Sequence, residues 1–269
     1  MSDDLRVGST ERTKSGGAGF AGTAAESVRR IADAVLYEGH MLFPYRASST
    51  KNRQRWTFGG VYPPAYARAT ADRSRVFCEC LVEGAAPQVD VEVRFLHGTE
   101  ERSVGVGPID DPPGRVTATL AGNRFTVAIE NTSPWSGLDR NEAMRHTHGS
   151  AHAILRVRGG SFVSAIESPE PLGNDGLWPV LVGEAGDRST MLASPIILPD
   201  YPQVAPESPG DFFDGCEIDG LLVLGILGLS DDEKREIRAG DSRARELLER
   251  TEAMSTDDLL RLHGTWRDA

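Results

Sequence analysis

Alternation of apolar and polar residues is the feature that most constrains how this chain can fold. In two stretches every second residue is apolar. These positions are Val89, Val91, Val93 and Phe95 in the first stretch and Phe125, Val127 and Ile129 in the second. A period of two is typical of strands that place one face on a core and the other in water. The chain is therefore expected to contain antiparallel β-structure.

Several strand-like runs are separated by turn residues. They lie near 75–83, 88–97, 115–120, 124–130, 151–158, 161–167 and 179–183. Gly159 and Gly160 join two of these runs and tolerate the positive φ values of a tight turn, so we predict a β-hairpin there. The pattern predicts an α+β fold: an antiparallel β-sandwich or open barrel with a short N-terminal helix and a helical C-terminal tail.

The sequence predicts four regions along the chain. They are a disordered leader at 1–24, a helix plus antiparallel β domain at 25–194, a proline-rich extended connector at 195–213 and a helical tail at 214–269. The N-terminal helix should run from about Ala24 to Glu38, and residues 40–70 should form loop and edge strand. Ser230 with Glu233 resembles a capping box within the tail. The first tail helix, rich in leucine and isoleucine, should dock on the β domain.

Composition and charge exclude several classes of protein. A net charge of -11 argues against nucleic acid as the main partner, and no apolar run approaches the ~18 residues needed to span a bilayer. The N-terminus lacks the apolar segment of an export signal, and three cysteines do not suggest a disulfide framework. We therefore expect a soluble cytoplasmic protein. Cys78 and Cys80 share one strand face and are interpreted as small core residues.

One basic stretch contrasts with this acidic background. Residues 39–71 contain no acid and carry +5, whereas residues 207–269 carry -8 from sixteen acids and eight Lys or Arg residues. Aromatic residues are interleaved with these cations, a mixture favoured at protein interfaces. The predicted partner-binding residues are Arg46, Lys51, Arg53, Arg55 and Trp56. Alternatively, the aromatic residues pack inward and the cations pair with the acidic tail.

His146, His148 and His152 are the candidate metal ligands. Their even spacings would place them on one strand face, where imidazoles can share an ion. Gly149 and Ser150 interrupt the run, however, and no carboxylate or thiol lies close in sequence. A solvated strand face is the preferred interpretation, because His152 shares its parity with two arginines.

No complete catalytic or cofactor motif is present. The sequence lacks a GxSxG elbow, a P-loop, a GxGxxG after a strand, an HExxH and a CxxC. No cofactor is predicted and no catalytic residue is assigned, although an enzyme with an unrecognised site stays open.

Three long stretches resemble an uncharacterised bacterial protein family encoded beside nickel–iron hydrogenase genes, especially in aerobic actinobacteria. They are YEGHMLFPYRASSTKNRQRWTFGGVYP, LWPVLVGEAGDRSTMLASPIILPDYPQVAPESPGDFFDGCEID and LSDDEKREIRAGDSRARELLERTEAMSTDDLLRLHG. The similarity spans most of the chain from about Val35 onward. It implies an accessory, assembly or scaffold function whose protein partner is a hydrogenase subunit or assembly factor. The alternatives are a metal-delivery protein that uses the three histidines and an unrecognised enzyme.

Overall fold

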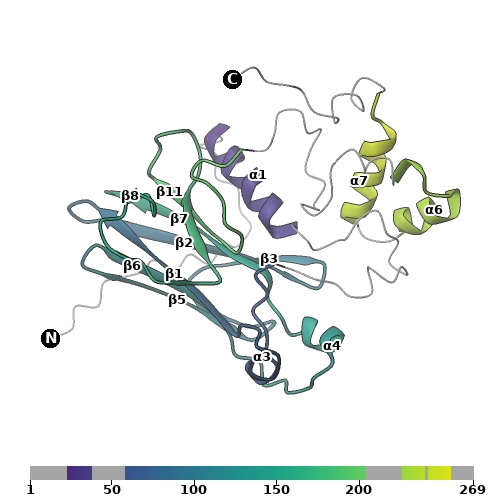
Figure 1. Cartoon of the computed structure of the whole chain (residues 1–269), viewed down its shortest axis with the longest axis horizontal. Coiled ribbons are helices and arrows are strands. Elements are labelled where there is room, and N and C mark those ends of the chain that lie inside the picture. Colours follow the sequence, from purple (N-terminus) through teal and green to yellow (C-terminus); the bar gives the residue numbers. More distant parts are fainter. Residues whose placement is uncertain (1–22, 38–57, 204–225, 240–241, 256–269) are drawn as a thin grey trace, which may run out of the picture. The chain divides into compact units, whose positions relative to one another are not determined.

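The computed structural model describes residues 23–37, 58–203, 226–239 and 242–255, and Figure 1 shows its helices and strands. The chain divides into two compact units, one of residues 1–36 and 58–202 and one of residues 37–57 and 203–269. The predicted leader lies almost entirely outside the described residues. None of the described helices is long and apolar enough to cross a membrane.

The first sheet is antiparallel and has the strand order β4-β5-β6-β1-β8, with β9 paired to β1. Its strands are β1 (Arg75–Glu83), β4 (Gly107–Ile109), β5 (Gly114–Ala121), β6 (Arg124–Asn131), β8 (Ser161–Val163) and β9 (Asn174–Asp175). Exposed residues of β5 alternate with buried or half-buried ones. This sheet therefore has one face on the core and one in solvent, as the alternation predicted.

The second sheet is also antiparallel and has the order β10-β11-β7-β2-β3. Its strands are β2 (Gln88–His97), β3 (Glu100–Val104), β7 (Gly149–Arg158), β10 (Trp178–Leu181) and β11 (Thr190–Ser194). All five residues of β11 are buried. Because both of its faces are covered, the sequence TMLAS does not alternate, and this strand was not predicted.

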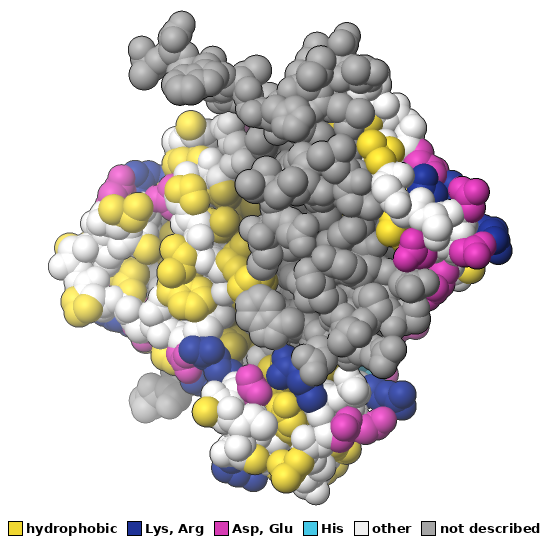
Figure 2. Space-filling model, turned by 45° about the vertical axis from the view of Figure 1, so that its right-hand side comes forward, with side chains coloured by type: hydrophobic (Ala, Val, Ile, Leu, Met, Phe, Trp, Pro, Cys, Tyr) yellow, Lys and Arg dark blue, Asp and Glu magenta, His cyan; other side chains and the backbone are white. Residues whose placement is uncertain are grey.

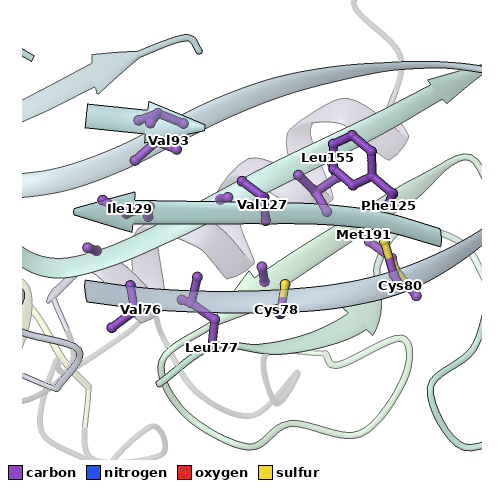
Figure 3. Packing of buried hydrophobic residues seen from close by; sticks show 14 of the residues in the cluster. Val76, Cys78, Cys80, Val93, Phe125, Val127, Ile129, Leu155, Leu177 and Met191 are labelled. Carbon is purple, nitrogen blue, oxygen red and sulfur yellow. The ribbon is translucent and has the colours of Figure 1, made fainter. Parts of the chain in front are cut away.

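The hydrophobic core contains side chains from both sheets, as Figure 3 shows. The first sheet contributes Val76, Cys78, Cys80, Val116, Phe125, Val127 and Ile129, and the second contributes Val93, Phe95, Leu155 and Met191. Two antiparallel sheets that share one core form a sandwich. The predicted fold class is confirmed, and so is the assignment of Cys78 and Cys80 to the core. Burial raises the pKa of the Cys80 thiol to about 12, so it is protonated at neutral pH.

Helix α1 (Thr23–Tyr37) confirms the short N-terminal helix. Its buried side chains recur at helical spacing and are Val28, Ile31, Ala32, Val35 and Leu36. Asp33 accepts a hydrogen bond of 2.6 Å from Arg94 of β2. Arg94 lies on the face of the second sheet that points away from the core, so α1 packs on that outer face, beside the strands in Figure 1.

The predicted hairpin at Gly159 and Gly160 is wrong. Strand β7 pairs with β11 and β2 in the second sheet, whereas β8 pairs with β1 in the first. The glycine pair therefore carries the chain from one sheet to the other. Gly159 does adopt a positive φ of 72°, and a Cβ on Gly160 would lie only 2.2 Å from the Glu83 carbonyl oxygen. Glycine is required here by the close approach of two strands.

Two short helices follow proline-rich and turn-rich sequence. Helix α3 (Pro64–Thr70) lies where we predicted loop and edge strand, so that interpretation is wrong for these residues. Proline is compatible with the first turn of a helix because the missing N–H has no partner there in any case. Asp139 caps the N-terminus of helix α4 (Arg140–Met144), because its side chain accepts a hydrogen bond from the Glu142 N–H.

The second unit contains α6 (Asp231–Ala239) and α7 (Ser242–Glu252). The predicted capping box is confirmed, since the Ser230 N–H donates to Glu233 at 3.0 Å and the Glu233 N–H donates to the Ser230 hydroxyl at 3.4 Å. Glu252 of α7 pairs with Lys234 and Arg238 of α6. The first predicted tail helix lies mostly outside the described residues, so its docking stays a prediction.

Candidate binding surface around α3 and α4

The three candidate metal ligands do not share a face. Two steps along β2 (Arg94 to Leu96) lie opposite three steps along β7 (His152 to Gly149), which identifies a β-bulge. Ser150 has a φ of +49° within it. Because of the extra residue, side chains separated by an even number of residues across the bulge point to opposite faces of the sheet. His148 consequently packs on the core residue Phe95, with ring centroids 4.7 Å apart, while His152 pairs in register with the outward-facing Arg94.

His148 and His152 are also not solvated, contrary to our expectation, since both are 0% exposed. His148 Nε2–H donates to the Pro112 carbonyl at 2.9 Å, and His152 Nδ1–H donates to the Ser150 carbonyl at 2.8 Å. The other nitrogen of each ring is buried without a partner. Burial lowers the pKa of both side chains, that of His152 to about 4, so both rings are neutral at neutral pH. Among the described residues, no three His, Cys, Asp or Glu side chains are placed to hold a metal ion.

His146 takes part in a row of aromatic rings. Its ring stacks on Trp135 with centroids 5.5 Å apart and an interplanar angle of 25°. Trp135 in turn contacts Tyr66 of α3 at 6.2 Å, and Tyr66 contacts Tyr62 at 5.4 Å. The two tyrosines are buried, whereas Trp135 and His146 are half-buried. The row therefore has a buried end on α3 and an accessible end on the segments that flank α4.

Asn131 holds these segments together. Its side-chain amide donates to the Val61 carbonyl at 2.9 Å and to the His146 carbonyl at 2.6 Å, and its oxygen accepts the Ser133 N–H at 2.9 Å. The residue is fully buried. One side chain thus fixes the entry to α3, the loop that leads to Trp135 and the segment that follows α4. Hydrogen bonds inside the protein make such a network rigid.

A second hydrogen bond fixes the end of α4. His97 Nε2–H donates to the Arg145 carbonyl at 2.9 Å, and its Nδ1 lies 3.4 Å from a carboxylate oxygen of Asp111. The backbone of Arg145 is therefore held, while its side chain is 75% exposed and lies 3.8 Å from Glu142. The guanidinium is available to a partner.

The outer part of this region presents apolar and charged groups together. Leu138 is 70% exposed and lies between Trp135 and α4. Figure 2 shows hydrophobic, basic and acidic side chains mixed over the lower part of the molecule, where Figure 1 places α3 and α4. We define the α4 surface as Trp135, Leu138, Arg145 and His146.

The predicted partner-binding residues all lie outside the described residues. They are Arg46, Lys51, Arg53, Arg55 and Trp56. Only the end of the basic stretch, from Phe58 onward, can be placed. There Tyr62 and Tyr66 pack inward, as the alternative interpretation of the aromatic residues held, and Arg68 is exposed. Burial raises the pKa of the Tyr62 hydroxyl.

Sequence analysis did not identify Trp135, Leu138 or Asn131. A signal was present in TSPWSGLD, where a large aromatic residue lies among turn-forming residues that rarely need one. A tryptophan in such a segment indicates a loop that packs on something. Its ring partners come from α3 and from the segment after α4, and no local pattern connects those segments.

Comparisons with known proteins give no relative from which a function can be transferred. No protein-family model matches the chain, and no curated protein matches it. The resemblance to the hydrogenase-associated family therefore depends on the three sequence stretches alone.

Proposed function

We propose that this chain is a non-enzymatic accessory protein that binds a protein partner through the α4 surface. The observation that carries the proposal is the half-buried Trp135, which stacks on His146, contacts Tyr66 and is followed by the exposed Leu138. Tryptophan, tyrosine and arginine dominate the energetics of protein interfaces, usually near the centre of the contact. Here Trp135 and Arg145 belong to the α4 surface, and the buried Tyr66 contacts the tryptophan ring from inside.

The arrangement also lowers the cost of binding. An interface side chain that is free to rotate loses ~0.5–1.5 kcal/mol when a partner immobilises it. Trp135 already has ring contacts on both sides, and the backbone on either side of His146 is held by Asn131 and His97. A partner would therefore meet a surface that is ordered before it arrives.

The partner class comes from the resemblance. The family that the three stretches resemble implies a hydrogenase subunit or a hydrogenase assembly factor, and we propose that the encounter takes place in the cytoplasm. The basic residues Arg46, Lys51, Arg53 and Arg55 would accelerate encounter with an acidic partner, because charges near an interface act mainly on the association rate. Trp56 would add a second aromatic anchor.

The test uses a matched pair of surface changes. Leu138→Asp places a charge on the α4 surface, and Thr117→Asp places the same charge on the exposed face of β5. The tagged full chain is isolated from its host while nickel–iron hydrogenase is expressed, and the captured proteins are identified. We expect L138D to lose a hydrogenase subunit or assembly factor that the parent and T117D both retain.

Folding must be checked beside capture. Leu138 is largely exposed, so L138D should melt within a few degrees of the parent, and a Trp135→Ala variant with an unchanged melting temperature would strengthen the result. Equal capture of hydrogenase proteins by the parent and by folded L138D would remove the α4 surface from the proposal. Capture of no hydrogenase protein by the parent would remove the partner class.

A further inference from the structure

A different side of the sandwich carries a second unusual surface. Strand β8 is at one end of the first sheet, and β10 is at one end of the second. The segment that follows β8 and the segment that follows β11 meet between them. The Ser164 hydroxyl donates to Asp200 at 2.5 Å, and the other carboxylate oxygen of Asp200 accepts the Leu181 N–H of β10 at 2.8 Å. We call residues 164–170 and 196–201 the closing loops, because they link the ends of the two sheets.

The closing loops are held by several hydrogen bonds. The Ile166 N–H donates to the Ser164 hydroxyl at 3.2 Å, and the Tyr201 N–H donates to the Leu181 carbonyl at 2.7 Å. Glu167 forms an ion pair with Arg188 at 2.7 Å. Side chains on these loops are therefore presented from a fixed backbone.

Each closing loop exposes an isoleucine. Ile166 is 85% exposed and Ile197 is 77% exposed, which makes them the two most exposed large hydrophobic residues in the described part of the chain. Single exposed hydrophobic residues are ordinary on a protein surface. Here two of them lie on segments joined by the Ser164–Asp200 hydrogen bond, and β-branched side chains have few rotamers to lose on binding.

The surroundings of the closing loops are acidic. Residues 161–203 contain six acids and one arginine, which gives a net charge of -5. Three of the acids form ion pairs, namely Glu167 with Arg188, Glu170 with Arg124 and Asp175 with Arg73. Within the described residues no ion pair involves the other three, Glu184, Asp187 and Asp200. Asp200 lies on a closing loop, and Glu184 and Asp187 lie in the turn before Arg188, which the Arg188–Glu167 ion pair joins to the other closing loop.

We infer that the closing loops bind a positively charged, apolar segment of a partner protein. Apolar contact with Ile166 and Ile197 would supply most of the affinity, and the acids would select a basic segment and accelerate its arrival. The same charge disfavours an anionic membrane or a nucleic acid. This surface is separate from the α4 surface, so the protein would hold two partners, or two parts of one partner, at the same time.

The probe is a short fluorescein-labelled peptide of alternating arginine and leucine, titrated with the full chain while anisotropy is recorded. A peptide in which glutamate replaces arginine is the charge control. The double variant Ile166→Ser and Ile197→Ser removes the apolar contact, and Leu227→Ser is its control at an exposed leucine outside both surfaces. Glu184→Gln removes one acid near the closing loops, and Glu249→Gln removes an exposed acid on α7.

We expect the double isoleucine variant to bind the basic peptide about tenfold or more weakly, and E184Q to bind it a few-fold more weakly with a smaller salt dependence. L227S and E249Q should bind as the parent does, and the acidic peptide should not bind. Equal binding by the parent and the double isoleucine variant would overturn the inference, because the peptide would then respond to net charge alone. Absence of binding to the parent would overturn it as well. Neither result would affect the α4 surface, which is tested with L138D.

Discussion

The two sheets differ in what covers the face that points away from the core. On the first sheet that face is open, so exposed residues recur along β5. On the second sheet α1 covers part of the same face, and β7 is buried on both sides from Gly149 to Leu155. Polar groups on a face that a helix covers must be paired inside the protein, whereas polar groups on a face in water can bond to the solvent instead. The second sheet accordingly holds the buried Arg94 and His152.

The largest effect on stability is expected from shortening one side chain on each outer face. Ile154 lies on the outer face of β7 and is 3% exposed, whereas Thr117 is exposed on β5. Ile154→Ala should lower the free energy of unfolding by ~2–5 kcal/mol, because the side chain leaves a cavity. Thr117→Ala should change it by less than ~0.5 kcal/mol. Urea denaturation measures both free energies of unfolding. A loss for Ile154→Ala as small as that for Thr117→Ala would show that the covered face contributes no packing.

The next largest effect should come from pH. The pKa of His152 falls from 6.5 to about 4 in the folded protein, because burial disfavours the charged ring. The unfolded chain therefore binds a proton at a higher pH than the folded chain. The folded protein therefore keeps the full contribution of His152 to its stability above pH 6.5, and its free energy of unfolding falls as the pH drops from 6.5 toward 4. The total loss from His152 is about 3 kcal/mol.

Replacement of His152 isolates this contribution. His152→Leu should flatten the decline in stability between neutral and acidic pH, measured by thermal melts across that range. A decline of the same steepness in H152L would assign the pH dependence to other groups, of which His148 is the first to examine.

A smaller effect is expected from the ion pairs that attach α1. Arg94 is 5% exposed and donates to Asp33 of α1 and to Glu101 of β3. Asp33→Asn should cost about 1 kcal/mol, because one of two carboxylates is lost from a buried guanidinium but the remaining pair is partly solvated. Hydrogen exchange should become faster in α1 than in the strands. Uniform acceleration across the strands would contradict a local attachment.

The smallest effect is expected farther along the same outer face. Arg158 and Asp90 form a pair at 3.0 Å, with side chains 68% and 49% exposed. Asp90→Asn should change the free energy of unfolding by less than ~0.5 kcal/mol, and added salt should remove even that difference. If Asp90→Asn costs as much as Asp33→Asn, then burial beneath α1 is not the reason that the ion pairs of Arg94 stabilise the protein.

Local patterns explain what could be predicted from the sequence. Strands β1 and β2 and helix α1 were located to within a residue or two, because each carries its own periodicity and is bounded by turn residues. Strand β11 was missed because burial on both faces removes the alternation. The sequence around Gly159 and Gly160 indicated a turn correctly but not which sheet each flanking strand joins, since that choice depends on partners far away in the chain.

The candidate site was less accessible to sequence analysis. The even spacing of the histidines suggested a shared face, and the bulge at Ser150 reverses it. The interruption at Gly149 and Ser150 is visible in the sequence, but the positive φ falls on Ser150 and not on a glycine, so the bulge itself could not be predicted. The α4 surface likewise depends on contacts among α3, Trp135 and His146, each from a separate segment. The basic residues between 39 and 57 lie outside the described part of the chain, so their role in partner binding stays a prediction.

The path of the chain between the sheets bears on how the protein is made. Strand β1 belongs to the first sheet, β2 and β3 to the second, β4 to β6 to the first, β7 to the second, β8 and β9 to the first, and β10 and β11 to the second. Neither sheet is built from a continuous piece of sequence. During synthesis β7 has no partner on one side until β11 has left the ribosome, and loop closure over such distances makes folding slow. Until Ser194 emerges, the nascent chain would expose an unpaired edge of β7, which is a site where unfinished chains can pair with one another.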